Sequence, residues 1–131
     1  MFKVKVYYED TDAAGIVYYA NYLKYLERAR TELLITKGLS NNILKKKFNI
    51  LLVVKSCNID FIKPAYLEDN LHIETSIDKI SKVQIFLSQK IFKNNVIILN
   101  GIIRIAIVSA DGKVCRLPKE LLSLLSTSDK L

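Results

Sequence analysis

One long segment, from about Tyr19 to Lys37, has helical periodicity, and no second long helix is predicted after it. Its apolar side chains recur at the spacing of one helix face: Tyr22, Leu26, Ala29 and Leu33. Gly38 follows the last turn, where a residue with positive φ commonly ends a helix. At about 1.5 Å per residue such a helix crosses a whole small domain. The rest of the chain therefore has to pack around it.

The remaining segments are patterned as strands. Phe2–Tyr8 alternates between apolar and polar side chains, as a half-buried strand does. Four strand-like runs follow a polar loop over Ser40–Lys47: Ile50–Phe61, Leu71–Ile80, Val83–Phe92 and Val96–Val108. The dipeptides at 94–95 and 111–112 predict turns, and Asn100-Gly101 predicts a bulge within the last strand. Leu117–Leu125, with a proline near its first position, predicts a short terminal helix.

This order of elements predicts an α+β fold, a single domain over residues 1–131. A roughly five-stranded antiparallel sheet would wrap the long helix. Strands of ten or more residues leave long edges and an open sheet face that a chain of 131 residues does not cover. Exposed edges and apolar faces of this size are normally paired or buried. We therefore expect a homodimer or a homotetramer.

The composition excludes several classes of protein. Half of the residues are hydrophobic and a quarter are charged, which excludes disordered and collagen-like chains. Cys57 and Cys115 form no C-x-x-C pair and His72 is the only histidine, so we expect no metal and no cofactor. The most apolar run, 96–108, contains Arg104 and is too short for a membrane span. Because the first residues lack a signal-peptide pattern, we expect a cytoplasmic protein with reduced thiols, and Cys57 as a small packing residue.

The net charge of +7, from 20 basic and 13 acidic residues, raises the question of a nucleic-acid partner. The lysines are scattered, and only Lys45, Lys46 and Lys47 form a run, which has no interleaved aromatic residues. Such a run is typical of a solvated loop, so we expect no nucleic-acid partner. The remaining interpretation is that some bases attract a smaller polyanion, such as the phosphates of a nucleotide-bearing cofactor or the acidic surface of a carrier protein.

Polar groups gather next to the helix start, in the segment from Glu9 to Asn21. Glu9, Asp10 and Asp12 place three carboxylates within four positions. One interpretation is that these acids only complement the positive end of the helix dipole. The other is catalytic, because free N–H groups at a helix start polarise a carbonyl while a nearby carboxylate acts as nucleophile or general base. The residue types alone leave both interpretations open.

The same segment resembles a known family. Residues 7–22, YYEDTDAAGIVYYANY, continue into YLERAR at 25–30. This stretch is similar to the signature of the hot-dog-fold acyl-CoA thioesterases, in particular the 4-hydroxybenzoyl-CoA thioesterase family and its Tol-Pal-associated YbgC-type branch. The resemblance implies a hot-dog fold and hydrolysis of thioesters carried by coenzyme A or by acyl carrier protein. It also implies an active site at a dimer interface.

The resemblance assigns roles to individual positions. Asp12 matches the catalytic carboxylate, which attacks the thioester carbonyl or activates a water molecule. Tyr19 matches the position whose backbone N–H holds the carbonyl oxygen. Gly15 matches the turn that brings the two together, and Val17 and Tyr18 match substrate-binding positions. Basic residues hold the coenzyme A phosphates in the family, and the candidates here are Lys55, Lys63 and Arg104.

One departure from the YbgC-type branch falls inside the motif. The branch has Tyr-His-Ala-Asn where this chain has Tyr-Tyr-Ala-Asn at 18–21, so a histidine side chain has no counterpart at Tyr19. A backbone donor survives this exchange, because every residue other than proline supplies one. The alternative function is a hot-dog protein that binds acyl groups or partners without hydrolysing them. Retention of Asp12 argues against that alternative.

Overall fold

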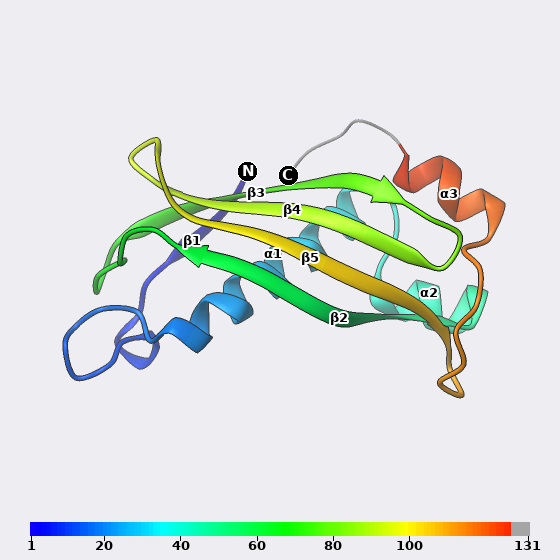
Figure 1. Cartoon of the computed structure of the whole chain (residues 1–131), viewed down its shortest axis with the longest axis horizontal. Coiled ribbons are helices and arrows are strands. Elements are labelled where there is room, and N and C mark those ends of the chain that lie inside the picture. The colour runs from blue at the N-terminus through cyan, green and yellow to red at the C-terminus, as the bar shows by residue number, and fades with distance from the viewer. Residues whose placement is uncertain (127–131) are drawn as a thin grey trace.

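The computed structural model describes residues 1–126, and residues 127–131, the end of the predicted domain, lie outside the described part. An antiparallel sheet lies across one long helix (Figure 1). The strands are β1 (Phe2–Lys5), β2 (Ile50–Phe61), β3 (Asn70–Ile80), β4 (Gln84–Lys93) and β5 (Val96–Ser109). The helices are α1 (Tyr22–Thr36), α2 (Asn41–Phe48) and α3 (Lys119–Leu125), with short 3₁₀ helices η1 (Tyr8–Asp10) and η2 (Tyr19–Asn21). None of the described helices is long and apolar enough to cross a membrane.

The strand order β1-β3-β4-β5-β2 gives the sheet two very different edges. All neighbouring strands are antiparallel. One edge is β1, with four residues, and the other is β2, with twelve. This arrangement of a long helix wrapped by a five-stranded sheet confirms the predicted α+β hot-dog fold. It also leaves the long edge of β2 unpaired within residues 1–126.

Two local predictions before β2 are wrong. The first strand ends at Lys5, because Tyr8–Asp10 turn into η1 and do not continue the alternation. The lysine run lies in α2 and not in a loop. Ser40 caps this helix by accepting a hydrogen bond from the N–H of Ile43, at 3.1 Å. Only Leu44 of α2 is buried, so the helix has almost no apolar periodicity that would reveal it in the sequence.

Two further predictions about the strands are also wrong. Gly101 pairs regularly with Gln89 and Ile59, so Asn100-Gly101 is not the bulge. The register between β4 and β5 shifts instead between Ile91, which pairs with Leu99, and Phe92, which pairs with Ile97. Cys57 is exposed and not packed, because it lies on the strand at the unpaired edge.

The hydrophobic core fills the space between α1 and the sheet. α1 contributes Tyr22, Tyr25, Leu26 and Ala29, all buried, as the helical spacing predicts. The sheet contributes fully buried side chains from three strands: Leu71, Ile73, Ile91, Ile103 and Ile107. Burial of large apolar side chains is the main source of stability in such a core.

A buried polar cluster joins α1 to the middle of the sheet. The side chains of Gln89 and Thr75 have no exposed surface. The Gln89 Nε2 donates to the carbonyl oxygen of Leu26 and to Thr75 Oγ1, each at 2.9 Å. Arg30 Nη1 donates to Gln89 Oε1 at 3.0 Å, and burial lowers the pKa of this guanidinium. Because these bonds reach the helix backbone itself, they fix the position of α1 along the sheet.

We predict that Gln89→Leu lowers the free energy of unfolding by about 2–3 kcal/mol, because the Thr75 hydroxyl and the Arg30 guanidinium lose a buried partner while the side-chain volume changes little. Urea denaturation followed by circular dichroism measures the change. In the double variant Gln89→Leu/Thr75→Val the loss should be smaller than the sum of the two single losses. Strictly additive losses would show that the hydrogen bond between these residues does not contribute.

Candidate active site

The segment from Thr11 to Tyr18 forms a small hairpin at one end of the molecule, in the blue loop at the left of Figure 1. Thr11 and Val17 form an antiparallel bridge. Across the tip, the Asp12 N–H donates to the Ile16 carbonyl at 2.9 Å, and the Gly15 N–H donates to the Asp12 carbonyl at 3.0 Å. Gly15 has a φ of +78°, a conformation that favours glycine, which agrees with its expected role in the turn.

Asp12 is exposed at the start of this tip. Its Oδ1 accepts a hydrogen bond from the N–H of Ala14 at 2.9 Å, which orients the carboxylate on its own turn. The Oδ2 atom has no hydrogen-bond partner among residues 1–126. The carboxylate is therefore held in place with one oxygen open to solvent, as a nucleophile or a general base requires.

Asp10 has a different, structural role. Only 8% of it is exposed, and its Oδ2 accepts from the Tyr7 N–H at 2.9 Å. Its carbonyl oxygen accepts both from the Tyr18 N–H and from Asn21 Nδ2, each at 2.9 Å. Burial, and then the nearby Asp10 carboxylate, raise the pKa of the Tyr25 hydroxyl. Asp10 thus ties the hairpin to the first turn of the helix. The hydrogen bond from the Asn21 side chain to Asp10 was not predicted from the sequence.

Tyr19 is the first residue of η2, which leads directly into α1. The N–H of Tyr19 has no acceptor in the described part of the chain. The preceding residue, Tyr18, is extended, with φ −62° and ψ 127°. The Tyr19 ring lies 5.1 Å from the Tyr18 ring and 6.1 Å from the ring of Phe61, measured between centroids. The helix start therefore offers a free backbone donor at the end of β2.

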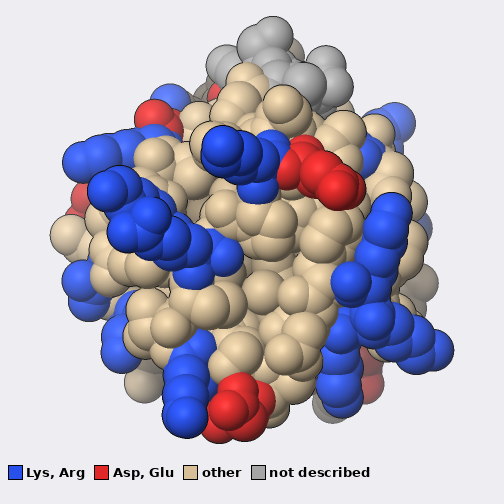
Figure 2. Space-filling model, turned by 90° about the vertical axis from the view of Figure 1, so that its right-hand side faces the viewer, with Lys and Arg blue, Asp and Glu red and all other residues tan. Residues whose placement is uncertain are grey.

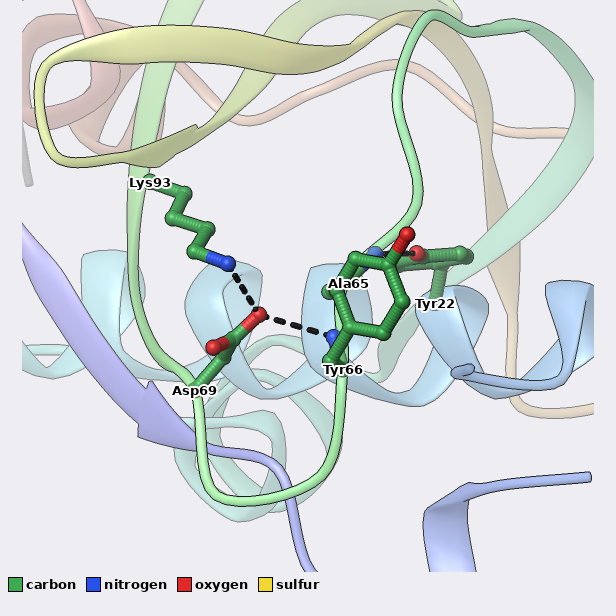
Figure 3. Close-up of polar contacts among 5 residues, drawn as sticks. All are labelled: Tyr22, Ala65, Tyr66, Asp69 and Lys93. Carbon is green, nitrogen blue, oxygen red and sulfur yellow. Dashed lines mark hydrogen bonds and ion pairs between the residues drawn. The ribbon is translucent and has the colours of Figure 1, made fainter. Parts of the chain in front are cut away.

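The loop between β2 and β3 supports this helix start (Figure 3). The Ala65 N–H donates to the Tyr22 hydroxyl at 3.0 Å, and the Ala65 carbonyl accepts from the Val17 N–H at 2.9 Å. Burial is the main reason why the pKa of Tyr22 is raised. Ala65 is completely buried, so one residue of this loop holds both the hairpin and α1.

The same loop is tied to the sheet by Asp69. Its Oδ2 accepts from the Tyr66 N–H at 2.7 Å and lies 2.8 Å from the Nζ of Lys93 on β4 (Figure 3). Nothing in the sequence predicted this contact, because the two residues are far apart along the chain. It connects the loop beside the site to β4, which lies two strands away from β2.

The remaining predicted site residues lie in different surroundings. Val17 is 3% exposed, so its side chain anchors the hairpin in the core and has no surface to offer a substrate. Tyr18 is about half exposed beside Tyr19. Arg104 donates from Nε to Ser56 Oγ at 3.2 Å on the outer strands, and Lys55 is exposed at the bulge of β2.

A cavity of about 190 Å³ lies between α1 and the sheet. Apolar side chains form most of its lining, among them Leu34, Leu52 and Ile85, and the charged residues Glu27 and Arg30 also line it. The α1 residues that line it begin at Glu27, past the first turn of the helix, which is the turn next to the Asp12 hairpin of the same chain. In the described residues, no group of three or more His, Cys, Asp or Glu side chains is placed to hold a metal ion.

Residues 6–125 match the thioesterase-like superfamily. The chain is 37% identical to the acyl-CoA thioesterase YbgC of Haemophilus influenzae, over 92% of this chain and 89% of that protein. The chain belongs to the thioesterase-like superfamily. Among solved structures of similar proteins, a probable thioesterase from Bartonella henselae has a TM-score of 0.86 at 33% identity, covering 89% of this chain and 97% of that one.

A second solved structure, a gentisyl-coenzyme A thioesterase, superposes with a TM-score of 0.88 at 27% identity over 97% of this chain and 100% of that chain. Its name specifies an aromatic acyl group, whereas the Haemophilus influenzae protein is named only for acyl-CoA. Membership of the thioesterase-like superfamily therefore fixes the fold and the general chemistry but not the acyl group.

Proposed function

We propose that the protein is an acyl-CoA thioesterase that hydrolyses the bond between the acyl carbonyl carbon and the sulfur of coenzyme A. The observation that carries the proposal is the free N–H of Tyr19 at a helix start, braced by shared hydrogen bonds to the hairpin that presents Asp12. Similarity over most of the chain to a protein named acyl-CoA thioesterase supports it. The same chemistry would serve a thioester on acyl carrier protein in the cytoplasm, and assays with both carriers distinguish them.

In the proposed reaction the carbonyl oxygen of the thioester accepts a hydrogen bond from the Tyr19 N–H. The positive end of the α1 dipole adds to the stabilisation of negative charge on that oxygen. The Asp12 carboxylate either attacks the carbonyl carbon, giving an anhydride that water then opens, or removes a proton from the water that attacks. In both routes the thiolate of coenzyme A leaves and takes up a proton.

We predict that Asp12→Asn lowers kcat by at least about 100-fold, because an amide can neither attack nor accept the proton. Steady-state assays with detection of the free thiol measure this loss over a panel of acyl-CoA lengths. Asp10→Asn serves as the control and should be milder, since the asparagine side chain can still accept the hydrogen bond from the Tyr7 N–H. Near wild-type turnover by a folded Asp12→Asn variant would favour the non-hydrolytic alternative.

The role of Tyr19 is tested by three substitutions. Tyr19→Phe and Tyr19→His keep the backbone donor, so kcat should stay within about tenfold of the wild type. Tyr19→Pro removes the N–H, and the extended conformation of Tyr18 is the one that a following proline requires. Its kcat should fall by about 100- to 1000-fold with a nearly unchanged circular dichroism spectrum. If Phe were as damaging as Pro, the phenol and not the N–H would act.

We further propose that the active form is a dimer closed along β2. The twelve-residue edge of β2 has no partner strand in the described part of the chain, and Val53, Val54 and Phe61 on it are 43–50% exposed. Antiparallel pairing of β2 with β2 of a second copy, related by a two-fold axis, gives the backbone N–H and C=O groups of both strand edges hydrogen-bond partners. It also sets the Phe61 end of one strand beside the Ile50 end of the other. The Asp12 hairpin of one subunit then faces the partner's cavity, which can receive the acyl group.

We expect sedimentation to give a dimer or a tetramer at micromolar concentration, with activity lost on dissociation. The physical reason is the cost of leaving a long strand edge and apolar side chains in water. Val54→Lys, which puts a charge on this edge, should shift the protein toward monomer and lower the activity in parallel. A fully active monomer would contradict both the edge pairing and the shared site.

A further inference from the structure

The lysine run on α2 is not used by the proposed chemistry. Lys45, Lys46 and Lys47 are exposed at consecutive positions of this helix. None of them forms an ion pair with another residue in the range 1–126. Figure 2 looks onto the end of the molecule that holds α2 and α3, where Lys and Arg side chains predominate over acids. This end therefore carries lysines that no acid within residues 1–126 pairs with.

The helix that carries this charge starts beside the cavity. Asn41, the first residue of α2, lines the cavity beneath α1. Lys45 follows it by four residues and so lies on the same side of the helix. Lys46 and Lys47 line a groove between α2 and α3. The run therefore begins one helical turn beyond a residue that lines the cavity, which the proposed dimer would bring to the partner's Asp12.

The substrate needs such a surface away from the catalytic hairpin. Coenzyme A carries its phosphates at the far end of the pantetheine arm, remote from the thioester. The hairpin and the turn before it contain Glu9, Asp10 and Asp12, whose charges repel phosphates. The Asp12 hairpin and α2 lie at opposite ends of β2. Tyr19, next to the hairpin, contacts Phe61 at one end of the strand, and α2 ends just before Ile50 at the other end.

Resting on the proposed thioesterase activity and the β2 dimer, we propose that Lys45, Lys46 and Lys47 of one subunit bind the phosphates of the acyl-CoA that is hydrolysed at the partner's Asp12. Lysine suits this role as a mobile point charge for phosphate. Each active site then takes its carboxylate and oxyanion donor from one chain and its phosphate contacts from the other.

The first test compares two substrates with the same acyl group. The triple variant Lys45→Gln/Lys46→Gln/Lys47→Gln keeps helix propensity and removes the charge. With the acyl-CoA that the wild type hydrolyses fastest, its KM should rise about tenfold or more and its kcat should stay within about twofold. With the N-acetylcysteamine thioester, which has no phosphate, its KM should not change.

The charge-matched control is Lys3→Gln/Lys5→Gln/Lys79→Gln. These three lysines are exposed on β1 and β3, near the opposite edge of the sheet. This variant should keep the wild-type KM for both substrates. A similar KM increase in the control variant would show that the effect comes from the net charge. An equal loss of activity toward both thioesters in the α2 variant would show that the lysines have only a structural role. Either result overturns the proposal.

A mixed dimer tests whether the lysines act on the partner's site. One chain carries Asp12→Asn, the other carries the three α2 substitutions, and two affinity tags select the pair. The only intact Asp12 then lies on the lysine-deficient chain and faces the intact lysines of its partner. The wild-type KM is expected at about half the rate per dimer, whereas the raised KM would overturn action across the interface. If the wild type hydrolyses neither thioester, the proposed function itself fails.

Discussion

The hydrogen bond from the Gln89 side chain to the carbonyl oxygen of Leu26 determines where α1 lies along the sheet. Apolar packing alone tolerates sliding of a helix over a strand face, because the hydrophobic effect has no direction. A buried amide that must satisfy a specific backbone oxygen removes this freedom. The position of the first helical turn, and with it the free N–H of Tyr19, follows from that bond. The Ala65 contact to Tyr22 holds the same end of the helix from the loop side.

Two acids that are neighbours in sequence serve opposite purposes because they differ in burial. Asp10 is almost fully buried, and both its side chain and its carbonyl are used to hold backbone and Asn21. Asp12 is exposed and keeps one carboxylate oxygen without a partner in the described chain. A purely structural interpretation therefore accounts for Asp10, whose carboxylate binds the Tyr7 N–H, whereas it accounts for only one of the two carboxylate oxygens of Asp12, the one that binds the Ala14 N–H.

Local patterns predicted much of the fold: periodicity gives the bounds of β2, and Gly38 marks the end of the long helix. The predicted first turn of that helix, from Tyr19, is instead the separate 3₁₀ helix η2. The strand order was not predictable, because pairing joins residues distant in sequence. Exposure of Cys57 depends on that order, since only the edge position of β2 exposes it. α2 escaped detection because a single buried leucine gives no period. In the candidate site, the sequence motif predicted Asp12, Gly15 and Tyr19. The supporting hydrogen bonds of Asn21, Ala65 and Asp69 were not predicted, because they depend on the folded structure.

The unequal edges of the sheet relate the charge distribution to the chemistry. A helix start favours acids, and the hairpin before η2 supplies them, so the same end of the chain is unsuited to a substrate with several phosphates. β2, at about 3.3 Å per residue, separates that end from the lysines of α2 by about 40 Å. No rearrangement within one chain of this fold brings the two together. The proposed antiparallel pairing of the β2 edge with its own copy would do so by symmetry, and it would give the long exposed strand a functional as well as a structural reason to remain unpaired in the monomer.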